Sequence, residues 1–500
     1  MKIIHIIKNS LSLVAIFLLT WASCKFLSYN APIIKHAYLN IAVLGICFAL
    51  LIVQILAFIN HSNHRATTIV RLVKGATLLL TTSIMVVAFL ESALWDYFQP
   101  YSCHDDVIYM SLVGILLFIL RFVFDVFTPS NERMSYVLAV LLLAMPASLG
   151  LWKKLQKPFS YGVDEQCVTH LFSGGDAGYD RFRIPSICVI PEVSVLANGD
   201  TLVVDRVLAY AEARRNGSLD QGDIDLVQRI SADAGITWSD IEVTQSWQPG
   251  IGKIGNPTPV FDKVSGLFWM FYIAGDFANE FGYNTWYMSS ADGGCTWSEP
   301  QKFGNCTVGP GHGIQIQNGF FKDRLVIPAY NREGAFTLIS DDQGQSWKQT
   351  DNLGVGNETE IAQADSCGNL VMITRIQIPL SKPHDELHKL LCYSKDGGAH
   401  WTTPVENTDL RTPICMSSIV RQNKQLYYSY PDQYFNRSNL TIARSDDSGQ
   451  SWSSKHVIYP GPAGYSDLAG LSNNDVLVLF ENGAVDYDER ITLVRVSEKK

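Results

Sequence analysis

The most conspicuous acidic residues of this sequence belong to a motif, Ser-x-Asp-x-Gly-x-x-Trp, that occurs five times. Repeated carboxylates could act as acids or bases, but this combination of residue types is that of a hairpin turn. Asp and Ser bond to local backbone, Gly supplies a positive φ, and Trp packs the turn onto its own sheet. We therefore expect these aspartates to be structural and to lie on the face opposite the active site. The copies, called the Ser-Asp-Gly-Trp repeat below, are Ser231/Asp233/Gly235/Trp238, Ser290/Asp292/Gly294/Trp297, Ser340/Asp342/Gly344/Trp347, Ser394/Asp396/Gly398/Trp401 and Ser445/Asp447/Gly449/Trp452.

The spacing of the repeat predicts the fold that must position any site. The copies start 59, 50, 54 and 51 residues apart, and a period near fifty is typical of the four-stranded blade of a β-propeller. About 320 residues from Phe182 to the end, divided by about 53, give six blades. The sequence therefore predicts an all-β, six-bladed β-propeller. Its last blade, about 455 to 500, lacks the motif and is expected to close the ring with an early strand near 182 to 190.

Charge and cysteine spacing exclude two classes of function. The formal net charge of -9 argues against nucleic-acid binding, which needs a basic face. None of the ten cysteines forms a Cys-x-x-Cys pair, and no His/Cys/carboxylate cluster shows ligand spacing. We expect neither a metal nor another cofactor, and an acidic substrate would have to be bound by local arginines.

The repeat and a series of short polar segments resemble the exo-α-sialidase (neuraminidase) family with Asp-box repeats, in its bacterial form. The resemblance becomes specific at Phe182-Arg183-Ile184-Pro185, which is similar to the Arg-Ile-Pro motif of that family. One such motif would be weak evidence, but the series keeps the family's order along the predicted propeller. The further segments are Ala211-Glu212-Ala213-Arg214, Asp220-Gln221-Gly222-Asp223, Gly255-Asn256-Pro257, Arg375 after the strand 370 to 374, Arg437-Ser438-Asn439-Leu440-Thr441, Tyr465-Ser466-Asp467-Leu468 and Phe480-Glu481.

The resemblance implies a substrate-binding group of four arginines. Arg183, Arg375 and Arg437 come from three predicted blades and would converge on the carboxylate of sialic acid. A planar guanidinium matches a carboxylate through paired, charge-assisted hydrogen bonds. Arg214 is assigned to substrate binding with them, and Glu481 would orient Arg183.

Asp220 matches the acid of the family, which protonates the departing oxygen. It lies in a Gly- and Asp-rich stretch, 216 to 225, that is typical of an exposed loop. Asp223 and Asp225 are alternatives. Asp225 is the weaker candidate because it enters the predicted strand 226 to 230.

Tyr465 matches the nucleophile of the family. A carboxylate would be repelled by the carboxylate on the anomeric carbon of sialic acid, and sialidases use a tyrosine there. A phenol with a pKa of about 10 needs a base. Glu360, which lies 15 residues before Arg375, is our candidate for this base, and Glu358 is the alternative.

The predicted function is that of an exo-α-sialidase that hydrolyses terminal sialic acids with retention of configuration. Its partners would be sialylated glycans, glycoproteins or glycolipids, with no nucleic acid. A trans-sialidase and a catalytically silent, glycan-binding propeller are the alternatives. The presence of both Asp220 and Tyr465 favours an enzyme, because a binding module needs neither an acid nor a nucleophile.

A change of composition near residue 155 predicts two domains, a multi-span transmembrane region at 1–155 and the propeller at 156–500. Five apolar runs have lengths near the roughly 20 residues that cross a bilayer. The first run could instead be a secretory signal, because Lys2 and Lys8 precede it. The runs are 9–24, 37–60, 75–90, 107–120 and 134–152.

The charges around these runs predict that the propeller faces outside, in the periplasm or at the cell surface. Basic residues follow the second run, whereas the loop after the third carries four acids and no base, which places that loop outside. Lys153, Lys154 and Lys157 oppose this orientation. The four acids are Glu91, Asp96, Asp105 and Asp106.

Overall fold

The chain separates into two units, Met1–Leu155 and Gln156–Lys500. The computed structural model describes parts of the second unit only. The five predicted membrane spans therefore lie outside the described residues, and no helix within the described residues is long and apolar enough to cross a membrane. The described ranges are 159–195, 201–248, 252–275, 284–376, 388–434 and 436–497.

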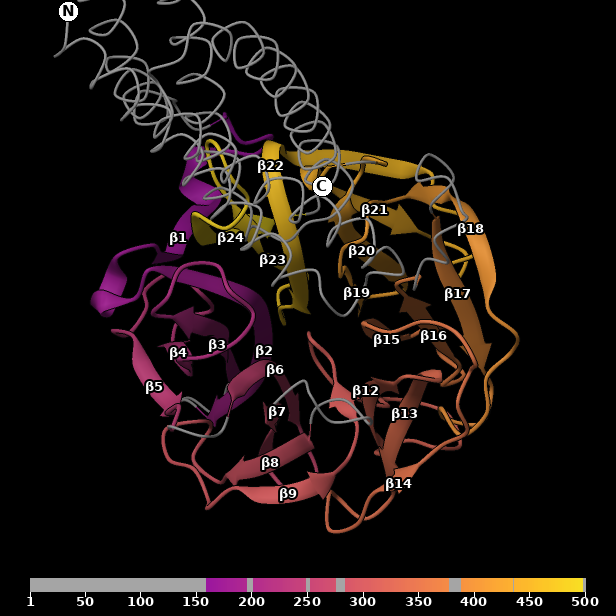
Figure 1. Ribbon diagram of the computed structural model, residues 1–500. Helices are drawn as coiled ribbons and strands as arrows, with labels where there is room; N and C mark the ends of the chain where they lie inside the picture. The colour runs from indigo at the N-terminus through magenta and orange to yellow at the C-terminus, as the bar shows by residue number, and fades with distance from the viewer. Residues whose placement is uncertain are drawn as a thin grey trace, which may run out of the picture. The chain divides into compact units, whose positions relative to one another are not determined.

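The described part of the second unit is almost entirely β structure, so the all-β prediction is confirmed. Antiparallel sheets are arranged around a common centre, as in a β-propeller (Figure 1). Within the described ranges the helical elements are two short 3₁₀ turns, η1 (Glu165–Cys167) and η2 (Asp176–Gly178).

Two of the sheets follow the order of the chain, with each strand paired to the next. The first consists of β2 (Arg181–Val195), β3 (Thr201–Arg214), β4 (Ile224–Ser231) and β5 (Glu242–Gln245). The second consists of β6 (Lys253–Phe261), β7 (Phe268–Gly275), β8 (Asn284–Ser290) and β9 (Gln301–Gly304).

The next two sheets continue this pattern around the centre (Figure 1). One has the order β10, β12, β13, β14, with β11 also paired to β12. Its strands are β10 (Thr307–Val308), β11 (Ile314–Gln315), β12 (Leu325–Asn331), β13 (Gly334–Ser340) and β14 (Lys348–Gln349). The other consists of β15 (Thr359–Gln363), β16 (Leu370–Thr374), β17 (His388–Ser394) and β18 (Val405–Arg411).

The last sheet has seven strands because one long strand takes part in two pairings. The first part of β22 pairs with β21, and its last part, from Ala463 onward, pairs with β23. The sheet runs in the order β1, β24, β23, β22, β21, β20, β19. Its strands are β1 (Val168–Ser173), β19 (Ser418–Gln422), β20 (Gln425–Pro431), β21 (Ser438–Ser445), β22 (Ser454–Gly470), β23 (Val476–Asn482) and β24 (Arg490–Val496).

The strand that pairs with the end of the chain is β1, so the prediction of a closing strand near 182 to 190 was wrong. Residues 182–190 belong to β2, which begins its own sheet. β1 pairs with β24 instead and buries Leu171 and Phe172 in the core. The preceding segment carries no repeat motif, and β1 is short, so the fifty-residue period did not reveal it.

The five Ser-Asp-Gly-Trp repeats form turns with the same internal contacts. In the first copy, the Ser231 Oγ donates to Asp233 Oδ1 at 2.7 Å and accepts from the Gly235 N–H at 2.8 Å. Asp233 also accepts from the Thr237 N–H, and Gly235 has φ of 87°. Each Ser is the last residue of the third strand of a four-strand run, at the ends of β4, β8, β13, β17 and β21.

Packing between neighbouring sheets fixes the strands that face the centre. Phe172 of β1, Phe182 of β2 and Leu479 of β23 lie in one buried cluster, and their burial removes apolar surface from water. Phe271 of β7 and Phe336 of β13 belong to the next interface. Such contacts hold the polar ends of the inner strands in fixed relative positions.

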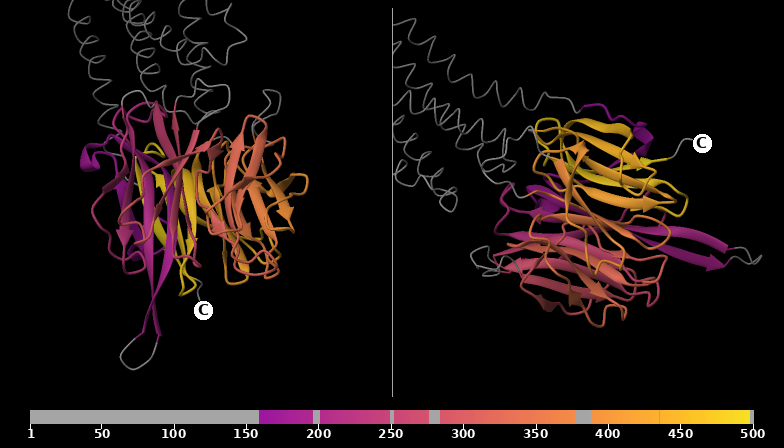
Figure 2. Two further views of the ribbon diagram at one scale, coloured as in Figure 1. Left: turned by 90° about the horizontal axis from the view of Figure 1, so that it is seen from below. Right: turned by 90° about the vertical axis from the view of Figure 1, so that its right-hand side faces the viewer.

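The hairpin of β2 and β3 shows on which side the site lies. Figure 2 shows these two strands projecting beyond the others on one side of the propeller. Arg183 pairs with Glu212 at the other end of the hairpin, next to Arg214. Along β4, Ile224 pairs with Arg214, whereas Ser231 pairs with Val207 further toward the projecting end. The first repeat therefore lies toward the projecting end, away from the arginines.

Candidate active site

Glu481 organises the first arginine of the site. Arg183 donates from Nε to Glu481 Oε1 at 3.0 Å and from Nη2 to Oε2 at 3.2 Å. The same buried carboxylate accepts the backbone N–H groups of Ile184 and Tyr465 at 2.9 and 3.0 Å. A register shift between Arg183 and Ser186, with Ile184 at φ of 57°, bends β2 at this point and aims Arg183 at Glu481. Burial opposes the charge of Arg183, but Glu481, together with Tyr487, Asp220 and Tyr465, outweighs it and raises the pKa of the guanidinium well above its ordinary value.

Tyr465, on β22, forms the centre of the site with Glu358 and Arg375. The phenolic O–H lies 2.7 Å from both carboxylate oxygens of Glu358, to which it donates. Arg375 donates from Nη1 to the phenolic oxygen at 3.0 Å and lies 2.7 Å from Glu358 Oε2. Arg375 is itself held by Asn357, whose Oδ1 accepts from Nε at 3.0 Å. The phenol therefore lies between a proton acceptor and a cation that stabilises a phenolate.

Two further arginines cover the ring of the same tyrosine. The guanidinium carbon of Arg437 lies 4.8 Å from the Tyr465 ring centroid, and that of Arg183 lies 5.4 Å from it. Both also lie over Tyr487, at 5.1 and 5.2 Å. The three predicted arginines thus surround one phenol, although they come from sequence positions far apart.

Arg437 differs from the other two because it has no carboxylate counter-ion in the part of the chain that the structure describes. Arg183 pairs with Glu481 and Arg375 with Glu358, but within the described residues Arg437 has no ion pair with a carboxylate. It donates from Nη2 to the carbonyl of Ile414 at 2.9 Å, and its buried Nε has no hydrogen-bond partner in the described part of the chain. A buried, unpaired guanidinium is costly unless an anion binds to it.

Asp220 lies on the rim beside Arg214. Its Oδ1 is 2.7 Å from Arg214 Nη1 and 3.6 Å from Arg183 Nη1, and 31% of its side chain is exposed. Arg214 is held by the fully buried Glu212. Burial opposes ionisation of Asp220, but Arg214, Lys253 and Arg183 outweigh it and hold the pKa of the carboxyl well below its ordinary value.

The two alternative acids face elsewhere. Arg215 donates to Asp223 at 2.6 Å and to Asp225 at 2.7 Å, and Asp225 also accepts from the Tyr179 hydroxyl at 2.6 Å. Neither has a contact with Arg183 in the described residues. Among the acids of this loop, the structure therefore brings Asp220 to the arginines.

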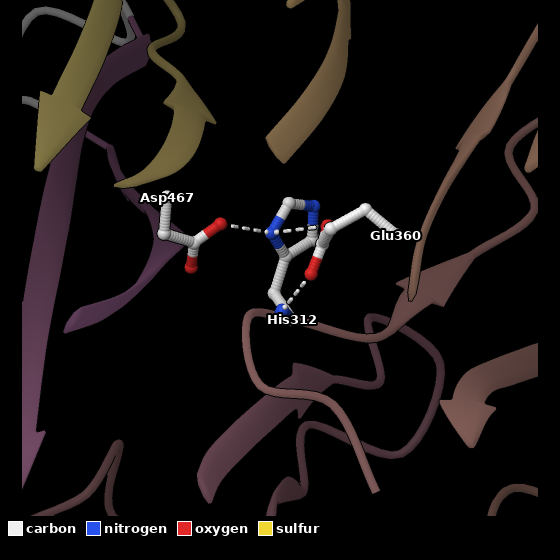
Figure 3. A group of neighbouring side chains, drawn as sticks. All are labelled: His312, Glu360 and Asp467. Carbon is white, nitrogen blue, oxygen red and sulfur yellow. Dashed lines mark hydrogen bonds and ion pairs between the residues drawn. The ribbon is translucent and has the colours of Figure 1, made fainter. Parts of the chain in front are cut away.

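Glu360, our first candidate for the base, does not contact the phenol. It is fully buried, and its Oε1 accepts from the His312 N–H at 2.9 Å while Oε2 lies 3.3 Å from His312 Nδ1 (Figure 3). Glu358 takes the place beside Tyr465. The strand β15 starts only at Thr359, so Glu358 lies at its rim end, whereas Glu360 points into the core. Sequence spacing left both residues open, because two residues along a strand lie on the same face.

Two site residues were given no role in the sequence analysis, although Glu212 stands in one of the segments that carry the resemblance. Tyr487, in the connection between β23 and β24, packs against Arg183 and Arg437, and no motif marked it. Glu212 precedes Arg214 by two residues on β3, and this same-face spacing could have indicated their pairing. His312, Glu360 and Asp467 also form a buried group of potential metal ligands, within 4.8 Å of one another, although they are far apart in sequence.

Comparison with known proteins identifies this architecture. The family model described as a BNR repeat-like domain matches residues 205–478, which is more than half of the chain. "Sialidase" of Micromonospora viridifaciens is 27% identical over 347 residues, covering 62% of this chain and 51% of that protein. "Sialidase-3" of Mus musculus is 25% identical over 414 residues, covering 66% of this chain and 94% of the mouse protein. The chain thus spans about half the length of the first relative and nearly all of the second.

Solved structures show the same fold at lower identity. Hadza microbial sialidase Hz136 superimposes with a TM-score of 0.54 at 22% identity, covering 66% of this chain and 68% of that one. The intramolecular trans-sialidase from Ruminococcus gnavus gives the same TM-score at 18% identity, covering 66% of this chain and 97% of that one. The curated sialidase relatives support a glycoside hydrolase, the solved structures share its β-propeller fold, and by its family match this chain belongs to the BNR repeat-like family.

Proposed function

We propose that this chain is an exo-α-sialidase that releases terminal sialic acids from glycoconjugates with retention of configuration. One observation carries the proposal. Arg183, Arg375 and Arg437 surround Tyr465, whose hydroxyl donates to Glu358. A group of guanidinium ions around an activated phenol suits a sugar whose anomeric carbon bears a carboxylate, whereas a purely structural tyrosine needs no such surroundings.

Binding would begin at the arginines. Arg437 has no carboxylate of its own in the described residues, so a substrate carboxylate would supply its counter-ion and share Arg183 and Arg375. A guanidinium offers paired donors to such a carboxylate. Glu481 would keep Arg183 in place throughout.

The chemical step would use Tyr465, Glu358 and Asp220 in turn. Glu358 accepts the phenolic proton while the oxygen of Tyr465 bonds to the anomeric carbon and the glycosidic bond breaks. Asp220 supplies a proton to the departing oxygen. A water molecule, deprotonated by Asp220, then attacks the anomeric carbon from the face that the leaving group had occupied and displaces the tyrosine, and the phenol recovers its proton from Glu358.

Asp220 must be protonated to act as this acid, and its charged neighbours oppose that in the free protein. Arg214, Lys253 and Arg183 lower the pKa of its carboxyl. A bound substrate carboxylate offsets the positive charge of Arg183, so it raises the pKa of Asp220 toward the range in which the group can donate a proton. Proton donation would thus depend on substrate binding.

The test is hydrolysis of an aryl α-sialoside by the purified full-length chain, followed by proton NMR of the fresh reaction. Two displacements predict that the first-formed sugar has the α configuration. A β-configured first product would exclude Tyr465 as nucleophile. Transfer to an added acceptor sugar, faster than hydrolysis, would favour a trans-sialidase, and binding without turnover would favour a silent propeller.

We propose that the seven-stranded sheet represents two blades that share β22, giving six blades in all. The double pairing of β22 with β21 and β23 supports this count.

We further propose that residues 1–155 anchor the chain in a membrane and that the propeller faces outside. The apolar runs and the acidic loop after the third run support this. Protease added to intact cells, with any outer wall opened, should then digest the propeller, and protection until lysis of the inner membrane would contradict the orientation.

A further inference from the structure

A buried group of three side chains lies beneath the centre of the site and joins the strands that carry it. His312 Nδ1 lies 2.7 Å from Asp467 Oδ1 and 3.3 Å from Glu360 Oε2 (Figure 3). All three residues are buried. Glu360 belongs to β15 and Asp467 to β22, so the imidazole bridges two strands from different sheets.

The positions of the two carboxylates relate this bridge to the proposed catalytic pair. Glu360 follows Glu358 by two residues, and Asp467 follows Tyr465 by two residues. Side chains two apart on a strand point to the same face and lie about 7 Å from each other along it. The segments around β15 and β22 are therefore linked twice in succession. The first link is the contact of Glu358 with Tyr465, and the second is the bridge from Glu360 through His312 to Asp467.

The connection between β10 and β11 is built to place His312 there. Gly311 has φ of 117°, and a Cβ at this position would clash with Glu360 Oε1. The carbonyl of Gly311 accepts from the Ser186 hydroxyl at 2.9 Å, and the His312 N–H donates to Glu360. A glycine is required for this approach, which brings the backbone and ring of His312 to the same carboxyl group.

We propose that His312 is a positioning residue, which fixes the separation of β15 and β22 through Glu360 and Asp467 and thereby sets the contact between Glu358 and Tyr465. The inference rests on the proposed function, in which that contact activates the nucleophile. Misplacement of reacting groups by about 1 Å can cost about 100-fold in rate.

The hydrogen bonds of the group favour a proton over a metal ion as the bridge. Asp467 already accepts from the Ile187 N–H, the Ser418 hydroxyl and the Leu468 N–H, besides facing His312. A carboxylate offers about four acceptor sites, and these three donors and His312 occupy them, so none is left for a metal ion. An imidazolium would then balance its charge.

The charges around His312 determine the pH range in which its imidazole is protonated and the bridge carries a positive charge. Burial opposes the imidazolium, but Glu360 on β15 and Asp467 on β22 outweigh it and raise the pKa of His312 from 6.5 to about 9. β2 and β19 contribute uncharged hydroxyls, from Ser186 and Ser418. Because the folded pKa of His312 is the higher one, its charge stabilises the fold below about pH 6.5, and this stabilisation is lost as the pH rises through about 9.

Two substitutions separate the hydrogen bond of His312 from its charge. His312→Asn places an amide nitrogen near the position of Nδ1 without a titratable group, whereas His312→Gln extends past it. We expect His312→Gln to lower kcat by tenfold or more, with less than a twofold change in KM, because the arginines remain in place. His312→Asn should recover part of kcat. Rates are divided by the fraction of active sites, counted by titration with a covalent inhibitor.

A stability measurement that needs no activity completes the test. The free energy of unfolding of the wild-type chain should exceed that of His312→Asn by an amount that shrinks between pH 6.5 and 9. His170→Gln, which removes an imidazole on the outer strand β1, serves as the control and should leave kcat and KM unchanged.

The outcomes are distinguishable. An inactive wild-type chain would refute the proposed function. An active wild-type chain with an unchanged kcat per active site in His312→Gln would refute the positioning role alone. A stability difference that does not vary with pH would refute the charged form of the bridge. One equivalent of a divalent metal in the purified wild-type chain, absent from His312→Gln, would replace the proton bridge with a metal site.

Discussion

Carboxylates occur both in the Ser-Asp-Gly-Trp turns and at the centre of the site, but their partners lie at very different distances along the sequence. In each turn, an aspartate contacts residues within four positions of itself, as Asp233 does with Ser231 and Thr237. In the site, Tyr465 contacts Glu358 from 107 residues away and Arg375 from 90. The turns are therefore local structures repeated five times, whereas the site exists only when the ring is assembled.

This difference decides what a carboxylate can do. The aspartates of the turns accept hydrogen bonds from backbone N–H groups a few residues further along the chain. Their oxygens are therefore already bonded, and we expect no role for them in catalysis. Glu358 faces a phenol and a guanidinium instead, and Asp220 faces two guanidinium groups. Substitutions in the two regions should consequently separate loss of catalysis from loss of stability.

The largest effect is expected at Tyr465. Tyr465→Phe removes the phenolic oxygen but keeps most of the packing, so kcat should fall by about 1,000-fold or more, with a small loss of stability. The measurement is the turnover of an aryl α-sialoside, together with thermal unfolding.

Tyr430→Phe is the matched control. Tyr430 is also buried and stacks on Tyr428, and its hydroxyl has no partner in the described residues. Its substitution should leave kcat unchanged. Retention of configuration with a nearly normal rate in Tyr465→Phe would move the nucleophile to another residue.

The next effect compares the two glutamates of the β15 segment. Glu358→Gln should lower kcat by about 100-fold or more, because the phenol loses its proton acceptor. Glu360→Gln should cost at least tenfold less, since it weakens only the buried bridge to His312. Steady-state kinetics of both variants at one pH measure the difference. A larger loss in Glu360→Gln would contradict the assignment of the base to Glu358.

These two glutamates also show where prediction from the sequence ended. The repeat and its period indicated an all-β propeller, because hairpin turns recur at intervals that a single chain reveals by itself. The choice between Glu358 and Glu360 depends on where β15 begins and on which side chains of other sheets lie opposite each glutamate. Tyr487 and His312 could not be assigned for the same reason, since their partners come from other sheets.

A smaller and more selective effect is expected at Asp220. Asp220→Ala should reduce hydrolysis of natural sialosides by about 100-fold or more, but that of aryl sialosides far less, because a phenol departs with little protonation. Comparison of kcat/KM for the two substrate classes measures this selectivity. An equal loss on both would indicate that Asp220 only positions Arg183 and Arg214, its partners in the ligand-free site.

The smallest effect on activity is expected in the turns, at Asp233. Burial opposes its charge slightly, but hydrogen bonds from Thr237, Ser231 and Ile236 outweigh it and lower the pKa of the carboxyl from 3.8 to about 2. A lowered folded pKa means that the charged form stabilises the turn above about pH 4, and that this stabilisation is lost as the pH falls through about 2.

Asp233→Asn should therefore lower the unfolding temperature at neutral pH while kcat/KM stays within twofold of the wild type. The difference in unfolding temperature should shrink on acidification. Because this turn is one of five and lies away from the arginines, weakening it should not change the position of Tyr465. A large fall in kcat/KM of fully folded Asp233→Asn would show that the turns transmit strain to the site, and the two regions would then not be independent.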